Sequence, residues 1–230
     1  MAIKKTISYY IEIFKMSNLK DISQQLAEIV IKIGAVKLSP EEPFTWASGA
    51  IMPIYTDNRI LLGKAEYREL VSDGFCEVLK IKSIHADLIA GTATAGIPHA
   101  TSLANALKLP MSYVRSEPKG HGRKKMIEGP VLQNKNAVLV EDLISTGGSA
   151  LKAISSLREE GMLADHCLAI FTYGFKKANK EFAKNNCALH TLLTFPELAS
   201  FAFKKSLITE KQKKMLNDWY KKPFEWGKSL

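Results

Sequence analysis

The chain has 230 residues, of which 46% are hydrophobic and 24% charged, and its formal net charge is +9. This length and composition are typical of a globular protein with a full core, and no apolar run approaches the ~20 residues that span a bilayer. A membrane-spanning chain is therefore excluded, whereas the positive charge leaves nucleic acid and polyphosphate compounds open as partners. Many lysines gather in terminal segments such as residues 211–214, which is typical of solvated helix faces rather than of a nucleic-acid recognition surface.

The three cysteines are odd in number and far apart, and none forms a Cys-x-x-Cys pair. This pattern predicts reduced core thiols in a cytosolic protein, without a metal-binding or catalytic role. The residues are Cys76, Cys167 and Cys187.

The N-terminal residues 1–15 are expected to be an extension outside the folded core. They do not resemble a secretory signal, because Glu12 interrupts the apolar part and no small-residue cleavage site follows. A helix is predicted directly afterwards, with Asn18 as a good N-cap, apolar residues at helical spacing and Gly34 at its end. Met16 is therefore an alternative natural start of the protein.

Residues 43–59 contain two short extended segments around Ser48-Gly49, and Pro53 interrupts the second. We predict an irregular hairpin before the main sheet. A helix over residues 61–79 follows, on apolar residues at helical spacing. The aromatic residues in this part of the chain could contact a ligand, and packing in the hydrophobic core is the alternative interpretation.

A buried strand over residues 86–90 leads directly into the small-residue stretch 91–96 and then a helix to about residue 107. Pro98 suits the first turn of that helix. Glycines let backbone approach a ligand and helix N-termini attract anions, so this stretch is a candidate anion-binding loop. A third strand is predicted over residues 109–114. The Gly-rich, basic stretch 115–129 after it is either a surface loop or a lid over a site.

The most informative stretch is residues 137–149. An apolar run predicts a buried strand over residues 137–140, Glu141 and Asp142 follow, and a Ser/Thr/Gly loop at residues 145–149 opens an amphipathic helix. The loop suits a phosphate, and paired carboxylates suit sugar hydroxyls. Together they indicate a phosphoribosyl group. An ordinary turn between strand and helix is the alternative.

Two further strands are predicted over residues 166–172 and 190–194, with a basic helical connection between them and two C-terminal helices over residues 196–205 and 209–220. The alternation of strands and helices predicts an α/β fold with a mostly parallel central sheet and helices on both faces. We expect one domain over residues 1–230, with residues 17–60 as a small, hood-like N-terminal segment on the substrate side.

Four separated motifs make the chain resemble the orotate phosphoribosyltransferases, a family with the type I phosphoribosyltransferase fold, from about residue 17 to the end. Stretch 137–149 resembles the signature for phosphoribosyl pyrophosphate (PRPP). Stretch 91–96 resembles the pyrophosphate loop, and the segments from Ser48 to Arg59 and from residue 113 to Gly129 resemble the substrate-side segment and the catalytic lid. The PRPP signature alone indicates only the superfamily, whereas the substrate-side segment and the catalytic lid make the match specific to this family.

The resemblance implies specific roles. The catalytic residues are Lys119 and Asp142. Residues that bind PRPP are Arg115, Lys119, His121, Glu141, Asp142, Leu143, Ile144, Ser145, Thr146, Gly147, Gly148 and Ser149. The pyrophosphate loop comprises Gly91, Thr92, Ala93, Thr94, Ala95 and Gly96. Orotate contacts Ser145 and Tyr55, unless Tyr55 is a core aromatic residue.

The implied reaction joins orotate to PRPP and gives orotidine 5′-phosphate and pyrophosphate, a step of de novo pyrimidine synthesis. Mg²⁺ is expected as the cofactor, bound mainly through PRPP, because no dedicated carboxylate cage is evident. The resemblance also implies a cytoplasmic homodimer whose lid loop reaches across the interface. Neither nucleic acid nor a membrane is expected as a partner.

Departures from other branches of the family leave the ligand of the orotate carboxylate open. Those branches have lysines where this chain has Ala47, Ala95 and Ser116, and the arginine that they have near the base has no equivalent around residues 172–174. Two other functions stay open at this point. One is a phosphoribosyltransferase for purine bases, and the other is a PRPP-sensing regulator that binds nucleic acid, although no helix-turn-helix is evident.

Overall fold

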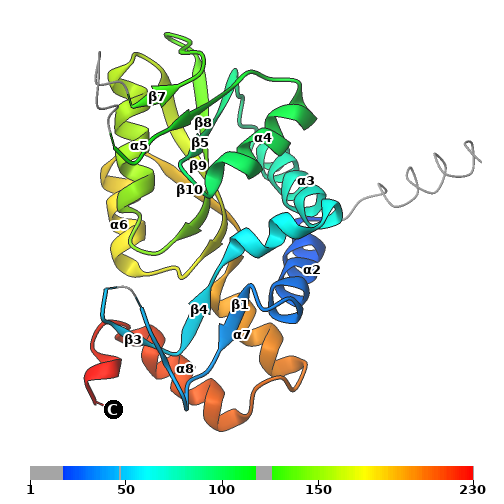
Figure 1. Cartoon of the computed structure of the whole chain (residues 1–230), viewed down its shortest axis with the longest axis vertical. Helices are drawn as coiled ribbons and strands as arrows, with labels where there is room; N and C mark the ends of the chain where they lie inside the picture. Colours follow the sequence, from blue (N-terminus) through cyan, green and yellow to red (C-terminus); the bar gives the residue numbers. More distant parts are fainter. Residues whose placement is uncertain (1–17, 47, 118–125, 230) are drawn as a thin grey trace, which may run out of the picture.

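The computed structural model describes residues 18–46, 48–117 and 126–229 (Figure 1). The predictions for the extension at residues 1–15 and for Met16 fall outside these residues. The described part consists of one central sheet with helices on both faces and a smaller lower part that contains two short sheets.

The central sheet has six strands in the order β10-β9-β8-β5-β6-β7. Every neighbouring pair is parallel except β6 and β7. This confirms the predicted α/β fold with a mostly parallel sheet. The strands are β5 (Leu88–Thr92), β6 (Met111–Val114), β7 (Ile127–Glu128), β8 (Asn136–Ile144), β9 (Leu163–Thr172) and β10 (Ala188–Thr194).

Helices cover both faces of this sheet (Figure 1). One face packs against helices α2, α3, α4 and α7, and the other against α5 and α6. Side chains alternate along each strand, so neighbours such as Val138 and Leu139 belong to different cores. The helices are α2 (Leu19–Lys32), α3 (Ala65–Ile81), α4 (Gly96–Leu107), α5 (Gly148–Glu159), α6 (Lys176–Lys184), α7 (Phe195–Lys204) and α8 (Glu210–Lys221).

Local sequence signals explain several helix ends. The Asn18 side chain accepts hydrogen bonds from the first backbone N–H groups of α2, as its sequence predicts. Thr194 and Thr209 each form a capping box, with Glu197 in α7 and Gln212 in α8. The predicted helical connection between the last two strands is confirmed as α6, and the helices predicted over residues 196–205 and 209–220 are confirmed within one residue.

The N-terminal segment forms two small antiparallel sheets. The predicted hairpin around Ser48-Gly49 is confirmed, because β2 (Phe44–Thr45) pairs with β3 (Ile51–Met52). A pairing that was not predicted joins β4 (Ile54–Thr56) to β1 (Val36–Leu38). A 3-10 helix, η1 (Asn58–Gly63), then leads into α3, which begins later than the predicted residue 61.

A cluster of aromatic side chains holds the N-terminal segment against the central sheet. The rings of Trp46 and Tyr173 lie 5.3 Å apart, and the hydroxyl of Tyr173 lies 3.1 Å from that of Thr56. The Trp219 indole N–H of α8 lies 3.1 Å from the Met52 sulfur. Tyr173 directly follows β9, so the cluster fixes the N-terminal segment next to the carboxyl ends of the central strands.

Candidate active site

The small-residue loops and the acid pair meet at one edge of the central sheet. In the parallel register, Gly91 of β5 lies opposite Val140 of β8, and the two strands end on the same side. Strand β8 runs to Ile144, so Glu141 and Asp142 lie within the strand. The sequence analysis had predicted that they follow it, and that prediction was wrong. The reason is pairing with β9, which continues to the Ile144–Thr172 pair.

The loop after β8 brings three features together. Ser145 and Thr146 are partly exposed, Gly147 is buried, and Gly148 opens α5 at the surface. Gly147 has φ +87°, and a Cβ there would lie 2.8 Å from the Phe182 ring, so only glycine fits without strain. The first N–H groups of α5 have no partner within the helix, and no side chain caps them. They are open to an anion.

The loop after β5 offers a second helix N-terminus. Strand β5 ends at Thr92 and α4 begins at Gly96, so the connection between them is three residues long. Its Ala93 N–H donates to the Val114 carbonyl at 2.8 Å, which ties it to the end of β6. The N-terminus of α4 also has no side-chain cap. Two helix N-termini that could bind an anion therefore lie at adjacent strands, β5 and β8.

Part of the predicted lid is described. Arg115 follows β6, and its guanidinium Nη1 lies 3.5 Å from the carboxylate of Glu128. The Lys152 ammonium of α5 donates to the Ser116 carbonyl at 2.8 Å, so the first residues of this loop lie against the phosphate-loop helix. Lys119 and His121 fall outside the described residues.

The acid pair is held in a buried environment. Glu141 is 7% exposed, and its carboxylate accepts a hydrogen bond from the Asp142 N–H at 2.9 Å. Burial, and next the neighbouring Asp142, raise the pKa of Glu141 to about 8. Burial also raises the pKa of Asp142, against opposing contributions that include Arg59. We therefore expect Glu141 to hold a proton at neutral pH and Asp142 to carry the charge.

This protonation predicts a pH dependence of stability. The folded protein keeps a proton on Glu141 between about pH 4.5 and 8, whereas the unfolded chain releases it. The free energy of unfolding therefore falls as pH rises through this window. Glu141→Gln removes the effect, so the stability of the variant relative to wild type should rise by about 3 to 4 kcal/mol between pH 5 and 8. Urea unfolding at several pH values measures this, with Glu159→Gln on the exposed face of α5 as the control. If the free energies of unfolding of the variant and the wild type differed by the same amount at pH 5 and at pH 8, the assignment would be contradicted.

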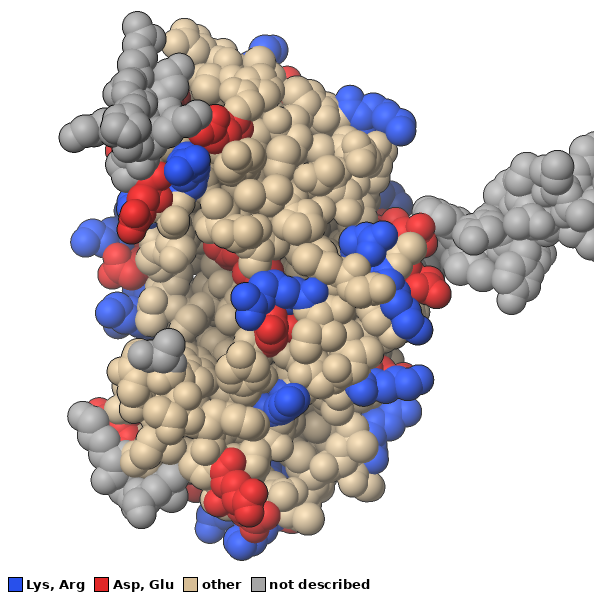
Figure 2. Space-filling model, in the orientation of Figure 1, with Lys and Arg blue, Asp and Glu red and all other residues tan. Residues whose placement is uncertain are grey.

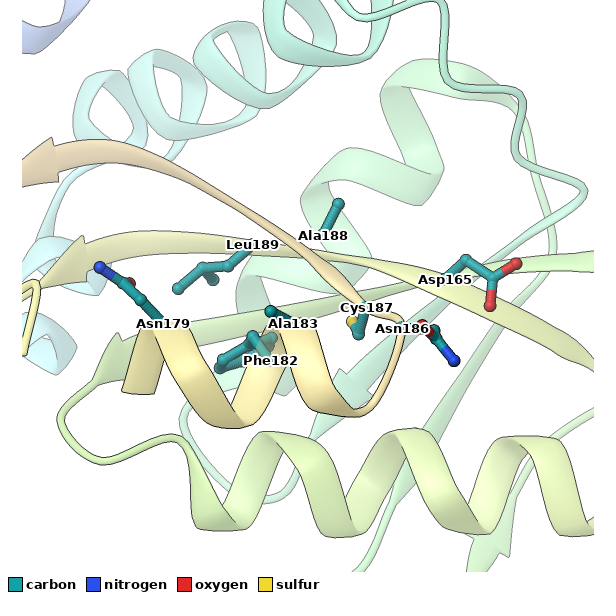
Figure 3. Close-up of a pocket in the computed structure, with 8 residues that line it drawn as sticks. All are labelled: Asp165, Asn179, Phe182, Ala183, Asn186, Cys187, Ala188 and Leu189. Carbon is teal, nitrogen blue, oxygen red and sulfur yellow. The ribbon is translucent and has the colours of Figure 1, made fainter. Parts of the chain in front are cut away.

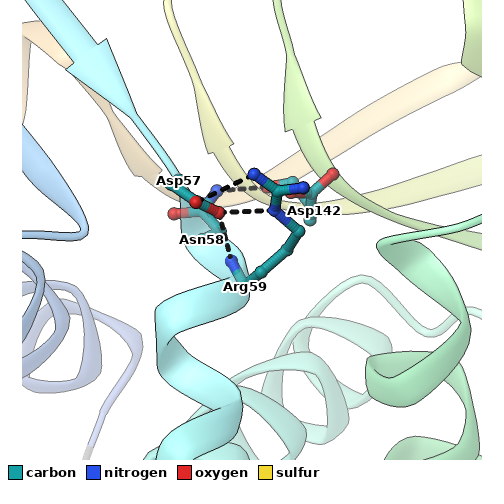
Figure 4. A network of polar contacts seen from close by, with 4 residues as sticks. All are labelled: Asp57, Asn58, Arg59 and Asp142. Atoms are coloured by element: carbon teal, nitrogen blue, oxygen red, sulfur yellow. Dashed lines mark hydrogen bonds and ion pairs between the residues drawn. The ribbon is translucent and has the colours of Figure 1, made fainter.

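The N-terminal segment contacts the acid pair directly (Figure 4). The Asn58 side-chain amide donates to the Asp142 carbonyl at 2.7 Å, and Arg59 forms an ion pair with Asp57 beside it. All three residues belong to the motif from Ser48 to Arg59, from which no individual role was predicted for them. Tyr55 is 41% exposed, with its ring 5.8 Å from that of Phe44. The alternative that Tyr55 is a core residue is therefore wrong.

Charges are interspersed around this site. Figure 2 shows lysine, arginine and acidic side chains scattered over the face it displays, which is hollowed between the sheet and the lower part. A separate hollow of about 500 Å³ lies at the other ends of β9 and β10, beside α6 (Figure 3). That hollow contains none of the predicted site residues. It is lined by Asp165, Asn179, Phe182, Ala183, Asn186, Cys187, Ala188 and Leu189.

Comparison with known proteins identifies the family. Residues 66–194, which include both loops and the acid pair, match the family described as "Phosphoribosyl transferase domain". The orotate phosphoribosyltransferase of Listeria innocua is 46% identical over 207 residues, which cover 90% of this chain and 99% of the relative. That of Lactococcus lactis is 44% identical over 205 residues, covering 89% and 98%. The chain belongs to the orotate phosphoribosyltransferase family.

Solved structures support the same family. The orotate phosphoribosyltransferase of Aeropyrum pernix is 30% identical, with a TM-score of 0.69, and the match covers 80% of this chain and 99% of that one. The UMP synthase of Leishmania donovani is 25% identical, with a TM-score of 0.72, over 86% of this chain and 42% of that one. The expected family and type I fold are thus confirmed, while the roles of single residues stay predictions.

Proposed function

We propose that this orotate phosphoribosyltransferase transfers the 5-phosphoribosyl group of PRPP to orotate, releasing pyrophosphate, in pyrimidine biosynthesis. The observation that carries the proposal is the meeting of two uncapped helix N-termini, a buried acid pair and the N-terminal segment at one sheet edge. Family membership supports orotate over a purine base as the acceptor.

PRPP lies across the two loops in this proposal. The 5′-phosphate binds the hydroxyls and N–H groups of residues 145–149, where the N-terminus of α5 favours negative charge. Asp142 and Glu141 accept hydrogen bonds from the ribose hydroxyls, with Asp142 as the charged member. The pyrophosphate binds residues 91–96 at the N-terminus of α4. Arg115, Lys119 and His121 approach it from the loop that follows β6.

Orotate lies between the ribose and the N-terminal segment. The resemblance to the family implies that Ser145 is next to the base in this arrangement. The exposed ring of Tyr55 contacts orotate from below. Its side chain faces outward on β4, so it is available to a ligand.

The transfer is a displacement at C1 of the ribose. A ring nitrogen of orotate forms the new bond to C1 while the bond from C1 to the pyrophosphate oxygen breaks. The electron pair leaves with pyrophosphate, and the proton of the ring nitrogen passes to solvent. Positive charge develops on the ribose ring at the same time. The Asp142 carboxylate stabilises this charge, and Lys119 stabilises the departing pyrophosphate. Closure of the loop around Lys119 would shield the reacting atoms from water.

Mg²⁺ is the expected cofactor. When bound, it would neutralise charge on the pyrophosphate. In the described part of the chain, no group of three or more His, Cys, Asp or Glu side chains is placed to hold a metal ion. Binding through PRPP oxygens and water, with Asp142 as a nearby carboxylate, fits both this arrangement and the coordination that Mg²⁺ prefers.

The protein is expected to act as a cytoplasmic homodimer. In the described residues, no helix is long and apolar enough to cross a membrane. Each subunit would contribute Lys119 and His121 to its partner's site. We treat residues 1–230 as one catalytic domain, with residues 17–60 on the substrate side.

Gly148→Ala tests the assignment of the phosphate loop. A Cβ at Gly148 would meet nothing within 4 Å, and alanine is a good helix former, so the fold should tolerate it. The methyl group would instead intrude on the space assigned to the phosphate. We expect an unchanged Tm and a KM for PRPP at least tenfold higher, measured by steady-state kinetics. Gly63→Ala, which also has open space, is the control. An unchanged KM for PRPP would place the phosphate elsewhere.

The activity itself is tested by mixing the protein with orotate, PRPP and Mg²⁺ and following orotate absorbance. The proposal predicts a decrease that requires PRPP and that purine bases do not slow by competition. Absence of any PRPP-dependent change would overturn it. Preferential consumption of a purine base would favour the other transferase, and salt-sensitive binding of DNA or RNA without turnover would favour a regulator.

A further inference from the structure

Orotate differs from uracil by a carboxylate, which is ionised at neutral pH. A carboxylate that leaves water on binding needs a cation or several hydrogen-bond donors. Arginine is well suited to this, because its planar guanidinium offers two parallel N–H groups to two oxygens. The inference below rests on the proposed function and concerns which side chain supplies that cation.

Arg59 is positioned and oriented by its neighbour. Its Nε and Nη2 donate to the two carboxylate oxygens of Asp57 at 2.7 and 2.9 Å. The same carboxylate accepts from the Arg59 backbone N–H at 3.2 Å, so both ends of the arginine are held. The Arg59 side chain is nevertheless 66% exposed. Figure 4 shows its guanidinium beside Asp142.

The distance between Arg59 and the acid pair is fixed by Asn58. This residue is 1% exposed, and its amide donates to the Asp142 carbonyl at 2.7 Å across 84 positions of sequence. The contact pins the start of η1 against β8. Arg59, as the next residue, is therefore set beside the proposed ribose site.

The surroundings of Arg59 match the place of the base. The ion pair with Asp57 raises the pKa of Arg59 most, and the carboxylate of Asp142 also favours the Arg59 cation. Arg59 thus lies near both the proposed ribose carboxylate and the exposed aromatic ring. A base joined to C1 of a ribose on Asp142 would extend into this region.

We propose that Arg59 binds the carboxylate of orotate. Asp57 occupies the Nε and Nη2 edge of the guanidinium, and among the described residues no hydrogen-bond acceptor contacts Nη1. The open edge accepts one carboxylate oxygen or both. Asp57 keeps the fork in place before the substrate arrives, so little side-chain entropy is lost on binding.

Lys37 is the alternative cation and provides a matched control. It lies opposite Tyr55 in the antiparallel pair of β1 and β4, so both side chains project from the same face. Like Arg59 it is exposed, and no ion pair holds it among the described residues. A general attraction of the anionic substrates to positive charge near Tyr55 would involve Lys37 as much as Arg59.

The test compares Arg59→Gln and Lys37→Gln with wild type in the full-length protein. Steady-state kinetics give kcat/KM for orotate at saturating PRPP, and KM for PRPP at saturating orotate. We expect Arg59→Gln to lower kcat/KM for orotate by about 30- to 100-fold, in the range expected when a charged hydrogen-bond partner is lost. KM for PRPP should change less than threefold, and Lys37→Gln should change neither value more than threefold.

Three results would overturn the assignment while leaving the proposed function standing. They are a loss for orotate below threefold in Arg59→Gln, an equal rise in KM for PRPP, and a larger effect of Lys37→Gln. An unchanged KM for PRPP also shows that Arg59→Gln has kept its fold. Absence of orotate turnover in the wild type would instead remove the proposed function, and the role of Arg59 with it.

Discussion

Replacing Asp142 with asparagine is expected to lower kcat by about 10²- to 10³-fold, the loss typical of one preorganised charge-stabilising group. Asp142 is the charged member of the acid pair because Glu141 holds a proton. Asparagine keeps the shape of the side chain and removes the charge that would face the developing cation on the ribose. Initial-rate assays with saturating orotate and PRPP measure kcat of the variant and of the wild type.

The fold should survive this substitution. Asn58 donates to the backbone carbonyl of Asp142, and Asp142 donates through its backbone N–H to Glu141, so neither contact needs the side-chain charge. Asp165→Asn, on the exposed start of β9, is the control and should retain full activity. A loss below fivefold in Asp142→Asn would mean that another group stabilises the transition state.

Gly96→Ala is expected to have the largest effect on stability and activity together. A Cβ at Gly96 would collide with the Val140 carbonyl oxygen, and it would also approach the Glu141 Cα within 3.5 Å. These are backbone atoms of β8 and cannot rotate away. Helix α4 would have to move from the strand, at a cost of about 3 kcal/mol for overpacking.

For a chain of this size, that cost corresponds to a fall in Tm of roughly 5–10 °C. The same shift would displace the acid pair and the N-terminus of α4, so kcat/KM should fall by about 100-fold or more. Gly63→Ala, whose Cβ would meet nothing within 4 Å, controls for the loss of a glycine. Calorimetry and kinetics on both variants decide the matter. A Tm and activity equal to wild type would show that α4 is not tightly seated on β8.

The chemistry-bearing stretch was predictable because its signals are local. An apolar run, two acids and a small-residue loop before an amphipathic helix lie within residues 137–149, and the structure places them at a strand end and a helix start. The parallel sheet followed from the regular alternation of strands and helices. The end of β8 was wrong by four residues, because pairing with β9 extends the strand beyond its apolar part.

Contacts between distant residues were not predictable in the same way. The pairing of β1 with β4 involves strands of three residues that carry too little alternation to be recognised. The hydrogen bond from Asn58 to Asp142 joins two motifs that the sequence shows only separately. The raised pKa of Glu141 depends on burial beside β5, which no local pattern reveals. The exposure of Tyr55 likewise became known only with the fold.

In the proposed site, PRPP lies across two loops, residues 145–149 and residues 91–96. The most direct test of this arrangement is a crystal structure of the protein with PRPP and Mg²⁺ bound. It should show the 5′-phosphate against the N–H groups of residues 145–149, the ribose hydroxyls on Asp142 and the pyrophosphate on residues 91–96. A phosphate bound beside α6 in the hollow of Figure 3, or PRPP bound without contact to residues 141–149, would contradict the arrangement proposed for this family member.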